Sequence, residues 1–184
     1  MDKQNLKLVI VINGRGGVGK DSVCDCVATG YSVLNVSSIT PIKEIAAIYG
    51  GWNGGKTEKD RRFLSDLKEI FTNYNDLPTR YLLAQVEAFK KDPVQQVMFA
   101  HIREPKNIKK FVDLLDGQAI TLLIKGRNDD KVYGNSSDDD VEKYPYDYVY
   151  INNKPLDKME EDVLAFFKDL ISQEEAKTYP HTFN

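Results

Sequence analysis

Cysteine and histidine are scarce in this sequence. The chain of 184 residues contains two cysteines and two histidines. Cys24 and Cys26 are two positions apart, which is too close for an ordinary disulfide, and two cysteines are too few for a zinc site. We therefore expect a reduced thiol in the core with a neighbour nearer the surface, rather than a disulfide scaffold or a zinc domain.

Long apolar runs and strong net charge are also missing. Leu8 to Ile12, the longest apolar stretch near the N-terminus, is far too short to cross a bilayer and is followed by no cleavage-site pattern. The formal net charge of −3 gives no overall attraction to nucleic acid. We expect a cytoplasmic monomer or homodimer with neither a membrane nor a nucleic-acid partner.

What is present is ordinary globular composition arranged as alternating strand-like and helix-like segments. The length suits one domain over residues 1–184. Apolar runs predict strands, and amphipathic or capped segments between them predict helices. The predicted strands are 6–13, 31–36, 94–102, 119–125 and 147–151. The predicted helices are 20–29, 42–49, 59–74, 76–92, 105–116 and 155–171.

Some element ends carry their own signals. Thr40-Pro41 is typical of a helix N-cap followed by proline at the first helical position. The tail after Gln173 is polar, and we expect it to fray. The alternation predicts an α/β three-layer sandwich, a five-stranded parallel sheet flanked by helices, in which ligands bind beyond the carboxyl ends of the strands.

A glycine-rich loop follows the first predicted strand and opens the first predicted helix. Gly14-Arg15-Gly16-Gly17-Val18-Gly19-Lys20 fits the G-x-x-x-x-G-K phosphate-binding loop, or P-loop. The backbone N–H groups of such a loop curl around phosphate oxygens, the helix N-terminus adds a positive dipole end, and Lys20 reaches the β- and γ-phosphates. The sequence therefore predicts a P-loop NTPase fold that binds a nucleoside triphosphate.

The residue after Lys20 departs from the common pattern. Asp21 stands where serine or threonine usually contacts Mg²⁺, and Ser22 follows it. Both side chains offer oxygen ligands of the kind that Mg²⁺ prefers, although Asp21 alternatively serves only the helix N-terminus. Because a carboxylate repels bare triphosphate, we expect nucleotide binding to depend unusually strongly on Mg²⁺.

Two groups of proteins share parts of this loop. Residues 15–20 resemble the deviant loop of the partition and division-site ATPases, which carry lysine at position 15 and threonine at position 21. Gly19-Lys20-Asp21 resembles phage-type deoxynucleoside monophosphate kinases and animal-type phosphomevalonate kinases. The second resemblance continues at Pro41-Ile42-Lys43, at His101-Ile102-Arg103 and at 146–149 with the asparagines at 152 and 153.

The kinase resemblance implies a nucleoside monophosphate kinase-like fold that uses ATP and Mg²⁺, with an acceptor-binding insertion at about 50–78 and a lid-like loop at about 126–146. It implies that Lys20, Arg103 and Arg127 stabilise the moving phosphoryl group. The expected acceptor contacts are Lys43, Arg61 and Arg62, and one of the two arginines is alternatively solvated. Asn153 is expected beside the adenine, or else in a turn before Pro155.

His101 departs from these families, which tend to have aspartate at that position. A histidine cannot replace a carboxylate in holding Mg²⁺-bound water, so Asp21 or Glu104 must do that work, or the enzyme is weak or inactive. Two other polar segments are not expected to belong to the site. Residues 138–140 read as a solvated acidic turn, and the tyrosines at 144, 146, 148 and 150 read as strand packing.

Three functions fit the motifs. The first is transfer of the γ-phosphoryl group of ATP to a small phosphorylated acceptor, with a nucleoside monophosphate favoured. The second is an ATPase or GTPase switch, although the aspartate of a guanine-specific motif is absent because Leu156 stands two residues after Lys154. The third is a degenerate kinase that binds nucleotide without turnover.

Overall fold

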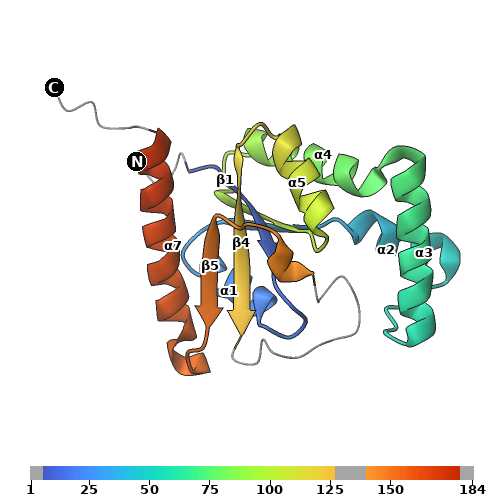
Figure 1. The fold of residues 1–184 in the computed structure, drawn as a ribbon, viewed down its shortest axis with the longest axis horizontal. Helices are drawn as coiled ribbons and strands as arrows, with labels where there is room; N and C mark the ends of the chain where they lie inside the picture. Colours follow the sequence, from blue (N-terminus) through green and yellow to red (C-terminus); the bar gives the residue numbers. More distant parts are fainter. Residues whose placement is uncertain (1–5, 127–139, 179–184) are drawn as a thin grey trace.

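Five parallel strands form the centre of the computed structural model, which describes residues 6–126 and 140–178. The strands are β1 (Leu8–Asn13), β2 (Val33–Ser37), β3 (Val97–His101), β4 (Ala119–Gly126) and β5 (Tyr148–Asn152). They are hydrogen-bonded in the order β2-β3-β1-β4-β5, and every pair is parallel (Figure 1). All five predicted strands are therefore present.

Helices lie between the strands, as predicted. They are α1 (Lys20–Ala28), α2 (Thr40–Gly50), α3 (Glu58–Asn75), α4 (Leu77–Lys91), α5 (Pro105–Leu114) and α7 (Leu156–Thr178), with a short 3₁₀ turn, η2 (Val141–Lys143), before β5. None of the described helices is long and apolar enough to cross a membrane.

Each face of the sheet has its own apolar core. Ile10, Phe99 and Leu122 pack on one side against α1 and α7, through residues such as Val23 and Phe167. On the other side, alternate residues of the same strands pack against α4 and α5. β1 is buried along its whole length because both faces are covered, which explains its continuous apolar run. The predicted three-layer α/β sandwich is confirmed.

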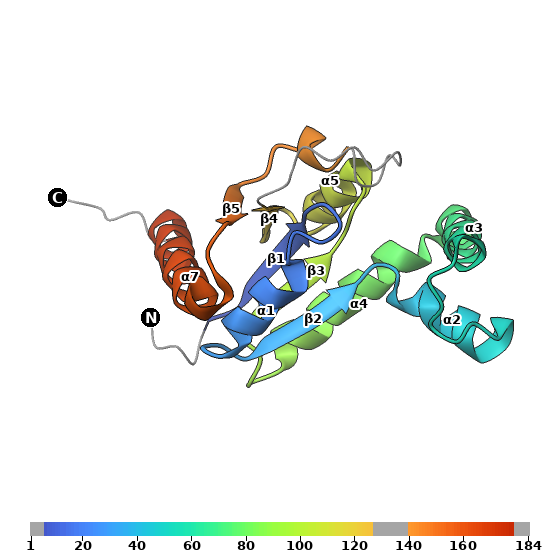
Figure 2. The same ribbon diagram turned by 90° about the horizontal axis from the view of Figure 1, so that it is seen from below.

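The α2–α3 pair stands apart from this sandwich. Both views place α2 and α3 at one end of the molecule and α7 at the other (Figures 1 and 2). α3 contains no fully buried residue. Its N-terminus is fixed locally by a capping box, in which Thr57 and Asp60 satisfy each other's backbone N–H groups.

Two predicted ends are wrong. Thr40 is the first helical residue and Ile39 the N-cap, because the backbone N–H of Lys43 donates to Ile39 O at 3.0 Å and no side chain caps the turn. The tail after Gln173 remains helical to Thr178.

The added turn of α7 is held by contacts that the linear sequence hides. The Tyr148 hydroxyl donates to a Glu174 carboxylate oxygen at 2.5 Å, and the Lys177 ammonium lies 5.2 Å from the centre of the Tyr148 ring. Strand β5 thus anchors a segment that composition alone marks as frayed.

Candidate nucleotide-binding site

The glycine-rich loop joins β1 to α1 at the carboxyl edge of the sheet. At Gly14, a Cβ atom would lie 2.5 Å from the carbonyl oxygen of Ile124 on β4. At Gly19, φ is +88° and a Cβ atom would lie 2.5 Å from the side-chain nitrogen of Asn152. Both positions therefore require glycine, and the loop is pressed tightly onto the ends of β4 and β5.

Lys20 folds back over the loop that precedes it. Its ammonium donates to the carbonyl oxygens of Gly14 at 2.6 Å and Arg15 at 2.9 Å. This holds a positive charge over the mouth of the loop, where phosphate oxygens would sit. The N-cap of α1 is Gly19, which has no side chain to occupy that position. The helix end is therefore shaped for an anion.

Asp21 and Ser22 lie exposed in the first turn of α1. Their oxygens fit the donor chemistry of Mg²⁺, which takes one or two protein ligands and keeps several waters. Within residues 6–126 and 140–178, no group of three or more histidine, cysteine and acidic side chains is arranged to hold a metal ion by itself.

Asn152 supports the loop from the end of β5. Its side-chain nitrogen donates to the Val18 carbonyl at 2.9 Å. The neighbouring Asn153 is exposed, and its backbone N–H closes a turn onto Ile151 O at 3.0 Å. Asn153 thus occupies the turn expected before Pro155, while Asn152 has a loop-supporting contact that the sequence did not predict.

A buried asparagine links the loop to two other segments. Asn13 is fully buried, and its side-chain oxygen accepts from the Gly14 N–H at 2.8 Å. Its side-chain nitrogen donates to Arg103 O at 2.9 Å and to the Tyr146 hydroxyl at 2.8 Å. That hydroxyl donates onward to Val141 O at 2.9 Å. Burial raises the pKa of Tyr146 to about 12, so the hydroxyl keeps its proton.

Sequence reasoning gave Tyr146 a packing role and gave Asn13 none. The role of Asn13 had one indication in the sequence: it is a polar residue at the end of an otherwise apolar strand, immediately before Gly14.

One carboxylate joins two cations beside the loop. Glu142 of η2 lies 3.4 Å from Arg15 of the loop and 2.6 Å from Lys125 at the end of β4. The positively charged groups of Arg15 and Lys125 therefore lie beside the glycine-rich loop, where phosphates would bind. Lys125 is the second-last residue of β4, the strand after which the predicted lid begins.

The end of β3 brings His101, Arg103 and Glu104 to the same edge. His101 lies beside the last residues of β1, with its Nε2 3.4 Å from Asn35 Oδ1 and 4.0 Å from Cys24 Sγ. Burial lowers the pKa of His101, and the Lys20 and Arg103 charges add to that effect against the opposing Asp21. The imidazole is therefore neutral at pH 7.

The cysteines match their predicted roles. Cys24 is buried and Cys26 half-buried, and both are free thiols. Burial raises the pKa of Cys24 to about 12, so this thiol is inert.

Arg103 is exposed at the corner between β3 and α5, on the ligand side of the sheet. Glu104 is turned instead toward α3, where its carboxylate contacts the Lys68 ammonium. The structure thus brings Lys20, His101 and Arg103 to the carboxyl edge of the sheet, whereas Glu104 is paired with Lys68 of α3.

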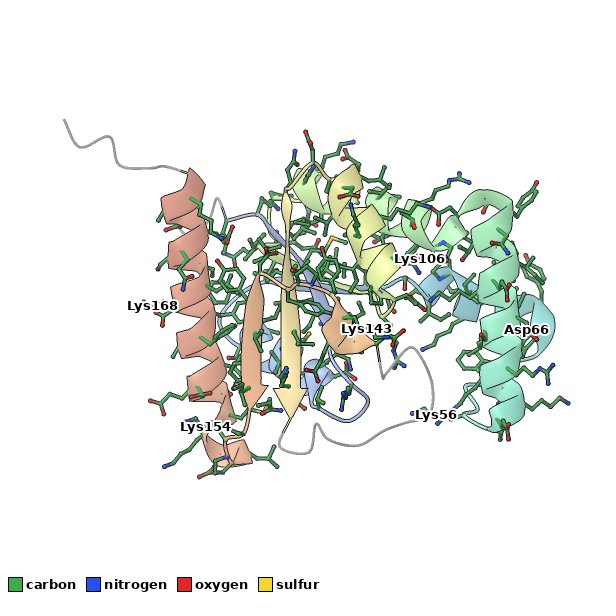
Figure 3. All side chains as sticks on the ribbon, in the orientation of Figure 1. Lys56, Asp66, Lys106, Lys143, Lys154 and Lys168 are labelled. Atoms are coloured by element: carbon green, nitrogen blue, oxygen red, sulfur yellow. The ribbon has the colours of Figure 1, made fainter. Side chains whose placement is uncertain are left out.

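The predicted acceptor residues lie on the α2–α3 end. Lys43 is exposed in the first turn of α2. Arg62 is paired with Asp66 at 4.0 Å, and both side chains are largely solvated. Asp66 lies on the outer side of α3, away from the sheet (Figure 3). Arg62 therefore belongs to the outer face of the helix.

Arg61 is also exposed, but it lies about 100° around α3 from Arg62. Arg61 and Lys68 are seven residues apart, so they differ by only about 20° around the helix. Since Lys68 reaches Glu104 on α5, Arg61 belongs to the face of α3 that looks toward the sheet. Arg127 and most of the predicted lid, 127–139, lie outside the described residues.

In sequence, the chain matches no protein-family profile and no curated protein. In structure, it is similar to a candidate kinase from Chloroflexus aurantiacus J-10-fl, with a TM-score of 0.51 and 11% identity over 90% of this chain and 97% of that one. A gluconokinase from Sinorhizobium meliloti 1021 gives a TM-score of 0.48 and 13% identity over 93% and 97%. The first likeness is one of fold alone, and the second carries no further conclusion.

Proposed function

We propose that this chain is an ATP-dependent phosphotransferase that moves the γ-phosphoryl group of MgATP to a small phosphorylated acceptor. The observation that carries the proposal is the glycine-rich loop, seated on β4 and β5 with the Lys20 ammonium folded across its mouth. The fold, in which this loop lies at the carboxyl edge of a five-stranded parallel sheet, supports the same reading.

The chain's own residues have distinct tasks in this proposal. Residues 14–20 bind the phosphates through backbone N–H groups. Lys20 and Arg103 neutralise charge that spreads over the equatorial oxygens of the moving group, and Arg127 is proposed to do the same from the lid. Asp21 and Ser22 would hold Mg²⁺, which would offset the negative charge of the phosphates. Asn153 is proposed to lie beside the base.

Positive charge around the acceptor side favours a phosphorylated acceptor. Arg61 is on the sheet-facing side of α3, and Lys43 is exposed at the start of α2. Lys56 lies on the side of α3 nearer the sheet, and Lys106 lies between α5 and α3 (Figure 3). Arginine grips phosphate through two parallel hydrogen bonds. A nucleoside monophosphate is the acceptor that we propose, and Arg61 is favoured over Arg62 as its ligand.

No side-chain base is required for this acceptor, because its phosphate is already ionised at neutral pH. The neutral His101 therefore does not block the reaction. Its task would be limited to lining the site between Lys20 and Arg103.

A coupled ADP-release assay tests the proposal across nucleoside monophosphates, nucleosides and phosphomevalonate. We expect turnover that depends on a phosphorylated acceptor and is lost in Lys20→Ala. Slow hydrolysis that no acceptor accelerates would contradict the proposal and indicate an ATPase.

A second function, nucleotide binding without turnover, is favoured by one observation. The β3 end carries His101 where related kinases tend to have a carboxylate, and Glu104, the nearest acidic residue in sequence, is bound to Lys68. Tight MgATP binding with no acceptor-dependent ADP release would support this function.

A further inference from the structure

An ion pair crosses from α3 to the corner that carries Arg103. The Lys68 ammonium contacts a Glu104 carboxylate oxygen, with side chains 19% and 33% exposed. The other Glu104 oxygen accepts from the Asn107 side chain at 3.2 Å. Burial raises the pKa of Glu104, but the Lys68 charge and the hydrogen bonds from Lys68, the backbone and Asn107 together lower it below its ordinary value, so the carboxylate is charged at pH 7.

Apart from this ion pair, α3 packs against α2 and α4. It contributes no fully buried residue, and one residue, Asp76, separates it from α4 with φ at +53°. Asp76 contacts Lys110 of α5 through one carboxylate oxygen and accepts from the Thr79 hydroxyl at 2.9 Å through the other. The contact between α3 and α5 is therefore made by charged and polar groups.

The space behind these pairs is small and of mixed polarity. A cavity of about 10 Å³ lies between the end of α3, α4 and α5. Polar residues such as Thr72, Asp76 and Asn107 line it together with Leu82 and Phe111 of the apolar core. Because α3 itself has no fully buried residue, its position can shift without emptying that core, and the ion pairs help to decide where α3 sits.

Two proposed ligand residues depend on that position. Arg103 directly precedes Glu104 in the chain. Arg61 is on the same face of α3 as Lys68, about 10 Å further along the helix axis. The Lys68–Glu104 contact therefore helps to set the separation between Arg61 on α3 and Arg103 at the sheet edge.

We propose that Lys68 and Glu104 are a positioning pair, which fixes α3 against the β3–α5 corner so that an acceptor phosphate held by Arg61 lies next to the phosphoryl group that Arg103 stabilises. This inference rests on the proposed function. Neither residue needs to touch the acceptor, because each acts through the arginine that it places.

Kinetic constants of Lys68→Met and Glu104→Gln test the pair. We expect the acceptor KM to rise about tenfold or more, because small displacements of ligand residues are costly, while the dissociation constant of MgATP changes less than about twofold. The exchanged variant K68E/E104K should recover part of the loss. Recovery stays partial because lysine at the N-terminus of α5 opposes the helix dipole. Lys109→Met, which breaks an exposed ion pair with Asp113 on α5, is the matched control.

Hydrogen–deuterium exchange supplies a readout that needs no turnover. Both single variants should speed exchange across α3 and leave α1 and α7 unchanged, and Lys109→Met should change none of them. Unchanged acceptor KM with unchanged α3 exchange would overturn the positioning role, as would an equal loss of MgATP affinity. If the unaltered protein shows no acceptor-dependent turnover, the proposed function fails, and faster α3 exchange in Lys68→Met still decides whether the pair fixes the helix.

Discussion

At the scale of single residues, Asp21 sets this loop apart from most loops of its kind. Its carboxylate is exposed one residue after Lys20, in the first turn of α1. In the proposed function, this charge would oppose a triphosphate bound by Lys20 when no metal is present. With Mg²⁺, the same oxygen atoms would become a favourable ligand.

We therefore predict that removing Mg²⁺ weakens ATP binding more in the natural protein than in Asp21→Asn. The difference should be about threefold to tenfold, as expected for one partly exposed charge near a phosphate. Calorimetric titration with and without the metal measures it. Equal ATP affinity under both conditions would contradict the metal role of Asp21.

His101 makes the free energy of unfolding depend on pH below neutrality. Its pKa in the folded state lies below the ordinary value of 6.5 because it is buried. As the pH falls through about 6.5, the unfolded chain takes up a proton that the folded chain resists, so the free energy of unfolding falls. Above that range both states are neutral and the effect disappears.

We predict that His101→Gln flattens this part of the stability profile. Between pH 7.5 and 5.5, urea titrations should show a smaller loss of stability in the variant, the difference being at most about 1.4 kcal/mol per pH unit. His181→Gln provides the comparison, because the chain has two histidines. Parallel profiles for His101→Gln and the natural protein would refute the burial argument.

At the scale of elements, the two adjacent arginines of α3 point in directions about 100° apart around the helix. Arg62 is paired with Asp66 on the outer face, whereas Arg61 shares the face of Lys68. The sequence could not separate them, because it gave no reference contact that orients the helix. The Lys68–Glu104 contact supplies that reference.

We predict that Arg61→Ala raises the acceptor KM by about tenfold or more, since a bidentate phosphate contact is lost. Arg62→Ala, its matched control, should change KM by less than about twofold because it loses only a solvated pair. Steady-state kinetics at saturating MgATP measure both. A larger effect from Arg62→Ala would mean that the outer face of α3 binds the acceptor.

The strands and the helix α7 also show what sequence patterns could and could not predict. The apolar runs and the glycine-rich loop predicted all five strands and the site between β1 and α1. The end of α7 was missed because Glu174 and Lys177 are held by Tyr148, 26 and 29 residues earlier in the chain. The roles of Asn152 and Tyr146 were missed for the same reason, since their partners, Val18 and Asn13, are distant in sequence.

At the scale of the whole molecule, the two apolar cores hold the strand ends that build the site. Phe167 of α7 is fully buried and meets Phe99 of β3 edge to face, with ring centres 5.7 Å apart. This contact joins the last helix to the strand that ends in His101. The packing of α7 thus helps to fix the sheet edge.

We predict that Phe167→Ala lowers the free energy of unfolding by about 3–5 kcal/mol, the usual cost of emptying a buried aromatic position. Phe166→Ala, at its half-buried neighbour, should cost clearly less. Urea denaturation followed by circular dichroism gives both values. Equal costs would indicate that the α7 face assignment is wrong.

We propose that the loop at residues 14–20 serves phosphoryl transfer to an acceptor. The most direct test of this proposal follows the label of γ-³²P-ATP during incubation with Mg²⁺ and a panel of nucleoside monophosphates. We predict that label appears in a nucleoside diphosphate made from the added acceptor, and that Lys20→Ala abolishes this product. Label found only in inorganic phosphate, or left in ATP, would contradict the claim.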